Sequence, residues 1–170
     1  DLALYYERGL TLIFEAILQA APPHARVLDV GGNIGWFTLL SASMHHHVDV
    51  FEPLLINQAR MCQSMQLNQP DWMTTLSESY HFPTMETEIQ TRSQKRTTIH
   101  LRHMGMSNRG GHVNIRYMIS NPGSARILTD EELELHKTKF AARSHISLME
   151  TGIPLSTLDR MAQHLQWFDN

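Results

Sequence analysis

The sequence has little cysteine, no long apolar run and no excess of positive charge. Cys62 is the single cysteine, so an internal disulfide is excluded, and its position in an expected helix favours a buried thiol over a nucleophile. No apolar run approaches the roughly 18 residues of a membrane-spanning helix. The net charge of −3 offers no basic patch for nucleic acid, and the 42% hydrophobic content suits a globular domain.

The stretch from Val27 to Phe37 predicts a buried strand that runs through a glycine turn into a helix. Gly31 and Gly35 lack a Cβ, so a ligand can approach the backbone of the turn closely. The helix is expected to begin near Ile34, with its free N–H groups facing that ligand. The sequence therefore predicts a nucleotide-binding turn here, with a purely structural turn as the alternative.

The spacing of the turn separates two classes of ligand. The dinucleotide fingerprint G-x-G-x-x-G fails, because Asn33 and Trp36 stand where glycines are required. The acid-x-Gly-x-x-x-Gly turn of S-adenosylmethionine methyltransferases is satisfied by Asp29, Gly31 and Gly35. A carboxylate at this strand end would repel a pyrophosphate and attract the ammonium and sulfonium groups of S-adenosylmethionine.

A second apolar strand is predicted over residues 48–51, and it ends on Glu52 and Pro53. Rossmann-like sheets present an acid to a ribose at about this separation from the turn. We expect Glu52 to accept hydrogen bonds from both ribose hydroxyls, while Pro53 ends the strand. The alternative is a solvated acid in a loop.

These residues resemble the FkbM-type methyltransferase family. Residues 27–35 are similar to its D-x-G-A-N-x-G turn, with Gly32 where alanine is usual, and Phe51-Glu52-Pro53 followed by Asn57 is similar to its F-E-P-x-x-x-N block. Looser matches are Met106-Ser107-Asn108 with Gly110-Gly111, and Thr157-Leu158-Asp159. The likeness covers residues 25–68 well, and 98–119 and 153–162 loosely.

The resemblance implies an α/β fold: a Rossmann-like class I methyltransferase sheet with helices on both faces. It also implies transfer of the methyl group of S-adenosylmethionine, commonly to a hydroxyl of a sugar, polyketide or similar small molecule. The implied cofactor-binding residues are Asp29, Gly31, Gly32, Asn33, Gly35, Glu52, Met106 and Ser107.

No residue can be assigned as a catalytic base, and no metal site is expected. His100 and His103 lie near the implied site, but their strand positions favour structural roles. The adjacent histidines 45–47 point in different directions and cannot converge on one ion, so we expect an exposed helix end there.

We expect one domain over residues 1–170. Its expected parts are an N-terminal helix within 1–24, a βαβα cofactor-binding core over 25–68, an insertion that is largely loop over 70–97, and a third strand, an added β-ribbon and helices over 98–170. The N-terminal helix is expected to pack through one apolar stripe.

The family's T-L-D helix leads directly into a central strand, and the chain stops at Asn170, where that strand should begin. With a first residue of Asp1, this predicts an incomplete domain, truncated before the fourth core strand. The strand at 27–30 would then pair with 48–51 on one side and with the missing strand on the other.

Local signals predict the elements of the C-terminal half. The ribbon should pair the strand at 113–119 with Ile146 and Leu148, and Asn121-Pro122-Gly123 should form a turn. Thr129 with Glu132 predicts a capping box, and Ser156 with Asp159 predicts the start of a last helix over 158–167.

Two other functions remain open at this stage. One is an NAD-binding oxidoreductase, which Asn33 and Trp36 disfavour, and the other is a non-catalytic nucleotide-binding or interaction module. Cofactor titration separates the first from a methyltransferase.

Overall fold

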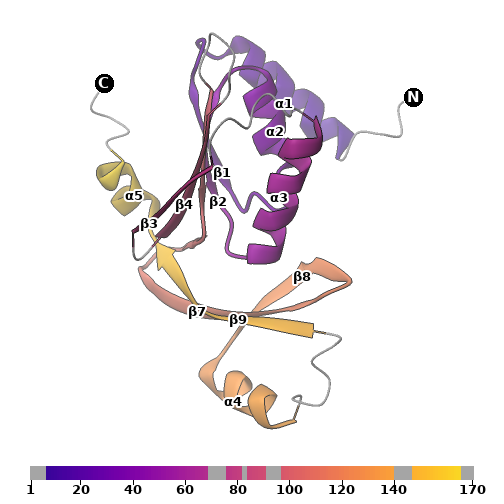
Figure 1. Ribbon diagram of the computed structural model, residues 1–170, viewed down its shortest axis with the longest axis vertical. Helices are drawn as coiled ribbons and strands as arrows, with labels where there is room; N and C mark the ends of the chain where they lie inside the picture. The colour runs from indigo at the N-terminus through magenta and orange to yellow at the C-terminus, as the bar shows by residue number, and fades with distance from the viewer. Residues whose placement is uncertain (1–6, 69–75, 82–83, 91–96, 140–146, 166–170) are drawn as a thin grey trace. The chain divides into compact units, whose positions relative to one another are not determined.

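The computed structural model describes residues 7–68, 76–81, 84–90, 97–139 and 147–165. It confirms the α/β class (Figure 1). Where the sequence predicted one domain, the chain divides into two compact units, Asp1–His103 and Met104–Asn170. Each unit contains its own sheet.

The first unit contains a five-stranded sheet in the order β1-β2-β5-β4-β3. Its elements are α1 (Arg8–Ala20), β1 (Arg26–Val30), α2 (Trp36–Ser43), β2 (His47–Phe51), α3 (Leu55–Asn68), β3 (Leu76–His81), β4 (Thr84–Gln90) and β5 (Thr98–Arg102). β1, β2 and β5 run parallel, and β4 pairs antiparallel with both β5 and β3. The three strands predicted from apolar runs are therefore confirmed, as is the pairing of the first with the second.

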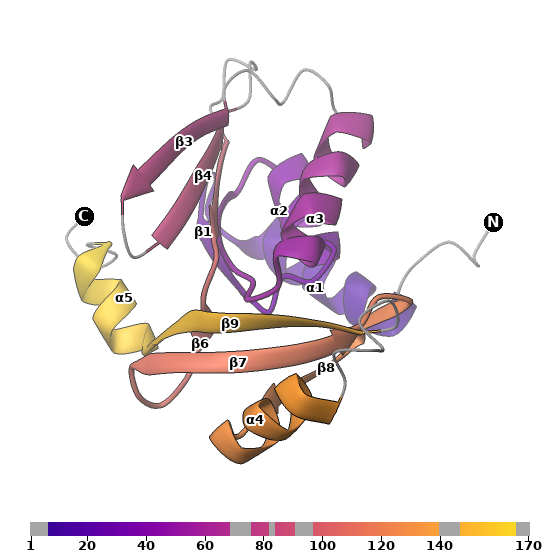
Figure 2. The ribbon, with the colours of Figure 1, turned by 60° about the horizontal axis from the view of Figure 1, so that its bottom comes forward.

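The core of this unit forms where branched apolar residues of the parallel strands meet the helices. Val48, Val50 and Leu101 are buried there with Met61 and Met65 of α3. Figures 1 and 2 show α1, α2 and α3 on one face of the sheet. The expected arrangement with helices on both faces is therefore wrong for the described part of this unit.

The described residues 76–81 and 84–90 are strands where a loop was expected, because β3 and β4 pair antiparallel. β4 extends the sheet beyond β5, with Glu88 opposite His100 and Ile89 opposite Ile99. The sequence Met85-Glu86-Thr87-Glu88-Ile89 does alternate with the period of a strand. Its polar composition nevertheless favoured a loop in the prediction. Pairing with β5 supplies the hydrogen bonds that stabilise β4 as a strand.

The N-terminal helix α1 packs less completely than its apolar stripe predicted. Leu18 is buried, and the Phe14 ring meets Phe37 of α2 edge-on at 5.0 Å between centroids. Ile13 and Ile17 nevertheless remain exposed, at 61% and 58%. The stripe is thus only partly covered by the described residues.

The free edge of β1 is apolar. Within the described residues β1 pairs with β2 alone, and Leu28 and Val30 are 42% and 51% exposed. A groove of about 370 Å³ follows this edge, lined by Leu10, Phe14, Val27, Leu28, Asp29, Val30 and Phe37. Unpaired strand edges flanked by apolar side chains are templates for pairing with another chain.

We therefore expect the protein to self-associate through this edge, and Val30→Lys to shift it toward monomer, because a lysine on an edge strand opposes pairing. Sedimentation velocity from micromolar to millimolar concentration measures the change. Leu67→Lys is the matched control, since Leu67 is 84% exposed on α3 and away from the edge. A wild-type chain that stays monomeric over this range contradicts the prediction.

The second unit contains a four-stranded sheet in the order β6-β9-β7-β8. Its elements are β6 (Gly105–Met106), β7 (Gly111–Met118), β8 (Asn121–Leu128), α4 (Asp130–Lys139), β9 (Ser147–Ser156) and α5 (Leu158–His164). β7 pairs antiparallel with β9, with Tyr117 opposite Leu148, which confirms the predicted ribbon (Figure 2). Ile146, which was also expected in this pairing, lies outside the described residues.

Local hydrogen bonds set the ends of these elements, and two of the predicted ends are wrong. The capping box is confirmed, because the Thr129 and Glu132 side chains each accept from the other's backbone N–H. The last helix is capped by Thr157, whose hydroxyl accepts from the Arg160 N–H, and not by the neighbouring serine.

The predicted turn at 121–123 is also displaced. Met118 pairs with Asn121, so the turn is at residues 119–120, and β8 begins at Asn121. Pro122 fits there because β8 is an edge strand, where a missing N–H costs no ladder bond.

Candidate nucleotide-binding site

The glycine turn between β1 and α2 adopts the strained backbone that its residues allow. Gly31 and Gly35 have φ of 82° and 90°, and Asn33 has φ of 50°, a left-handed conformation that asparagine tolerates best among residues with a Cβ. The Gly31 N–H donates to the carbonyl of Phe51 at 2.8 Å. The turn is therefore held against the end of β2, and α2 begins at Trp36, slightly later than expected.

The three glycines of the turn have different surroundings. A Cβ on Gly32 would lie 2.4 Å from Cγ1 of Val50, and one on Gly35 would lie 2.5 Å from Cγ of Met61. Both are therefore packing positions, and Val50 occupies the space that an alanine at 32 would need. A Cβ on Gly31 would meet nothing within 4 Å. Gly31 is thus the turn glycine beside which a ligand has room.

Asp29, the last-but-one residue of β1, lies at the base of this turn. The Thr38 hydroxyl, on the first turn of α2, donates to Oδ2 of Asp29 at 2.5 Å. Burial raises the pKa of Asp29, because a desolvated carboxylate loses its hydration, and the Thr38 hydrogen bonds partly offset this rise. A negative charge held in such surroundings gains by interacting with a cation.

Glu52, immediately after β2, is buried to 3% exposure and held by three donors. Oε2 accepts from the Asn33 N–H at 2.8 Å, so the carboxylate is bonded directly to the glycine turn. Oε1 accepts from the Leu54 N–H at 2.9 Å and from Nδ2 of Asn57 at 3.2 Å. The alternative of a solvated loop acid is therefore wrong.

The same bonds limit what Glu52 can offer a ligand. A carboxylate has about four lone-pair directions, and the three donors described fill all but one of them, which is on Oε2. We expected acceptance from two ribose hydroxyls at once, whereas the geometry leaves one strong acceptor position beside Asn33.

Neighbouring side chains hold the backbone at this strand end. Nε2 of Gln58 donates to the Glu52 carbonyl at 2.6 Å. Nε2 of His103, just past β5, lies 2.8 Å from the Pro53 carbonyl. This contact agrees with the structural role expected of His103.

The structure brings one group of the predicted site residues together, at the ends of β1 and β2: Asp29, Gly31, Gly32, Asn33, Gly35 and Glu52. Met106 and Ser107 belong to the second unit, where Met106 ends β6 and the Ser107 N–H donates to the Ser156 carbonyl at 2.9 Å. Their part in a cofactor site stays a prediction.

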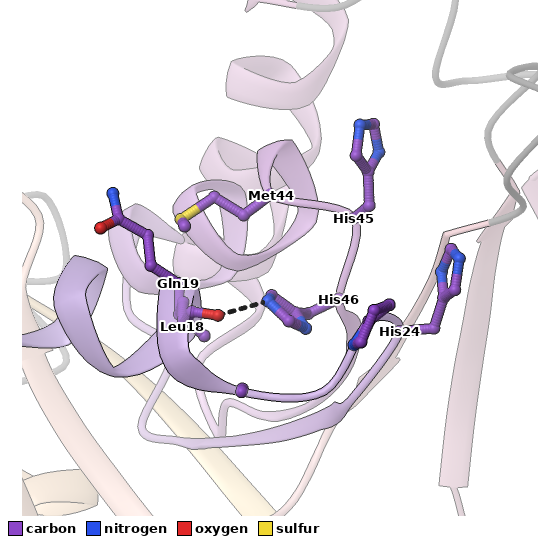
Figure 3. Close-up of a pocket in the computed structure, with 8 residues that line it drawn as sticks. Leu18, Gln19, His24, Met44, His45 and His46 are labelled. Atoms are coloured by element: carbon purple, nitrogen blue, oxygen red, sulfur yellow. Dashed lines mark hydrogen bonds between the residues drawn. The ribbon is translucent and has the colours of Figure 1, made fainter.

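The adjacent histidines 45–47 each have a different environment, as Figure 3 shows for the first two. His46 is 3% exposed and its Nε2 lies 3.1 Å from the Leu18 carbonyl at the end of α1. The expectation of an exposed helix end is therefore wrong for His46, because α1 covers it. His45 points away from that ring, and His47 lies in β2, where it bonds to Thr98.

Sequence reasoning missed the residues that bond to the carboxylates of Asp29 and Glu52, and the one that bonds to the Glu52 backbone carbonyl. Thr38 faces β1 from the third position of α2, and a threonine nine residues after a strand acid was a detectable signal. Asn57 was noticed only as part of a motif, and Gln58 was not noticed. Their partners follow from the packing of α3 against the end of β2, which spacing alone does not reveal.

No family model, curated protein or solved structure matches this chain. Among the described residues, no helix combines the length and apolar character needed to cross a membrane. The function must therefore be argued from the geometry of the site.

Proposed function

We propose that this protein is an S-adenosylmethionine-dependent methyltransferase that acts on a hydroxyl of a small molecule or sugar. The observation that carries the proposal is the bond between the Glu52 carboxylate and the Asn33 N–H of the glycine turn. It joins the acid that follows β2 to the turn that follows β1, beside the open space at Gly31.

The arrangement of strands supports this proposal. β1, β2 and β5 are parallel and adjacent, with α2 between the first two and α3 after the second. In open α/β sheets, ligands bind outside the carboxyl ends of such strands. We assign the first unit to the Rossmann-like class I methyltransferase topology on this basis.

Charge favours this cofactor over a dinucleotide. Asp29 and Glu52 place two carboxylates at the turn, where burial raises the pKa of Glu52 most and the nearby charge of Asp29 raises it further. Two acids would repel a pyrophosphate and attract a cationic ligand. The dinucleotide fingerprint also lacks glycine at Asn33 and Trp36.

When bound, S-adenosylmethionine would supply the methyl group for transfer to a substrate hydroxyl oxygen and would leave as S-adenosylhomocysteine. The residues of this chain bind and orient: Gly31 leaves the backbone open, Glu52 accepts from a ribose hydroxyl, and Asp29 attracts positive charge. Such enzymes gain rate mainly from alignment of the reacting atoms. We assign no residue as the base that takes the substrate proton.

Calorimetry with S-adenosylmethionine, S-adenosylhomocysteine and NAD tests the proposal. We expect binding of the first two in preference to NAD. Glu52→Ala should weaken it by about 1.5–3 kcal/mol, the loss of one charge-assisted hydrogen bond, or about tenfold to a hundredfold at 1.4 kcal/mol per decade. Equal or tighter NAD binding would favour the oxidoreductase alternative. Cofactor binding without transfer to any hydroxyl acceptor would favour a non-catalytic module.

A further inference from the structure

The side chain of Asn57 is hydrogen-bonded to the Glu52 carboxylate. Asn57 lies in the first turn of α3, is 4% exposed, and donates through Nδ2 to Oε1 of Glu52 at 3.2 Å. Its own Oδ1 is buried and has no hydrogen-bond partner among the described residues. A buried amide with one unsatisfied end costs stability relative to an apolar residue of similar size. Packing alone is therefore a poor reason for an asparagine here.

The donors are divided unequally between the two carboxylate oxygens. Oε1 accepts from Leu54 N–H and Asn57 Nδ2, which fill both of its lone-pair directions, while Oε2 accepts from Asn33 N–H alone. Asn57 thus saturates one oxygen, and the remaining acceptor capacity lies on the oxygen that faces the glycine turn.

We propose that Asn57 is a positioning residue for the ligand: by saturating Oε1 of Glu52, it directs Oε2 toward the glycine turn as the acceptor for a ligand hydroxyl. This inference rests on the proposed function, because the hydroxyl is that of the S-adenosylmethionine ribose. Asn57 itself touches neither the ligand nor the reacting atoms.

The electrostatics of Glu52 give this role a measurable signature. Burial raises the pKa of Glu52, the bonds from Leu54, Asn33 and Asn57 lower it, and the charge of Asp29 raises it. Loss of the Asn57 donor should therefore raise this pKa further. The ionised carboxylate is the stronger acceptor. As the pH decreases, ligand affinity should therefore be lost at a higher pH in the variant than in the wild type.

Charged and titratable groups face Glu52 from two neighbouring strands. Asp29 approaches from β1, and His103, just beyond β5, contacts the next carbonyl, that of Pro53. Neither is changed by a substitution at Asn57. A moved titration midpoint in an Asn57 variant is therefore attributable to the lost donor.

The test compares Asn57→Ala and Asn57→Leu, whose side chain has a similar size but no donor and no charge, with the wild type and with Gln58→Ala. Gln58 is a matched control, because it is the next residue of α3 and bonds to the Glu52 carbonyl rather than to its carboxylate. The Glu52 pKa is measured from the pH dependence of its carboxyl ¹³C shift. The S-adenosylmethionine dissociation constant is measured by calorimetry across the same pH range.

We expect the Glu52 pKa and the midpoint of the affinity profile to rise together in both Asn57→Ala and Asn57→Leu, because both lack the donor and neither adds a charge. For a rise of one unit in this pKa, affinity should fall about fivefold at the wild-type midpoint and by up to about tenfold below it, and recover at higher pH. Gln58→Ala should leave the midpoint in place. Asn57→Leu fills the space of the asparagine side chain, so it still decides the matter if the alanine variant does not fold.

Two results overturn the inference. One is a Glu52 pKa that is unchanged in both Asn57 variants. The other is a loss of affinity that is uniform across the pH range, which indicates a purely structural role. If the wild-type protein binds no S-adenosylmethionine, the proposed function fails and the ligand part of this inference fails with it. The ¹³C titration then still decides whether Asn57 controls Glu52.

Discussion

Replacing Asp49 by alanine should lower the free energy of unfolding by about 3–5 kcal/mol, the usual cost of removing one partner of a buried ion pair. Asp49 lies in β2 and Arg102 in the adjacent β5, and their side chains are 1% and 2% exposed. The guanidinium of Arg102 donates to Oδ1 of Asp49 and lies 5.5 Å from the centre of the Phe51 ring. Without the carboxylate, the buried guanidinium loses the ion pair that Asp49 provides.

Urea denaturation followed by circular dichroism measures this loss, which is a large part of the roughly 5–15 kcal/mol that stabilises a typical protein. Arg26→Ala is the matched control: Arg26 contacts the same carboxylate at 3.6 Å but is 45% exposed. Exposed pairs contribute about 1 kcal/mol or less. Replacing Asp49 and Arg102 together by leucine should restore much of the stability. A single variant as stable as the wild type would contradict the role of this pair.

Replacing Gly31 by valine should lower the affinity for the cofactor at least about a hundredfold, while the protein still folds. Gly31 has φ of 82°, where a branched side chain is strained by roughly 1–3 kcal/mol. No atom lies within 4 Å of the position its Cβ would take, so the side chain would enter the open space that the proposed cofactor would use. Calorimetry with S-adenosylmethionine measures the loss.

Gly152→Val is the matched control for backbone strain. Gly152 lies in β9 of the second unit, has φ of 67° and also has nothing within 4 Å of an added Cβ. Its variant should lose a similar amount of stability and keep its affinity for the cofactor. Retained binding in Gly31→Val would show that the ligand does not approach the turn at Gly31. Equal losses of affinity in both variants would mean that strain, and not obstruction, explains the effect.

The sequence by itself determined the features that depend on near neighbours in the chain. The strand from Val27 to Val30, the glycine turn after it and the strand at 48–51 were predicted where the structure has them, although β1 is half exposed and not buried as expected. The capping box of Thr129 and Glu132 was predicted for the same reason. In each case the physical cause, a steric preference or a short-range hydrogen bond, acts over a few residues.

Only the tertiary structure decided features whose partners lie far apart in sequence. Residues 76–81 and 84–90 are polar enough to form a loop, yet they form strands because β4 pairs with the edge of β5 and β3 pairs with β4. His46 is buried because α1 ends with a carbonyl beside it. Glu52 faces the glycine turn because Asn33 and Asn57 converge on it from two different elements. A single sequence encodes such contacts jointly, so neither residue of a pair reveals the other until the backbone has brought them together.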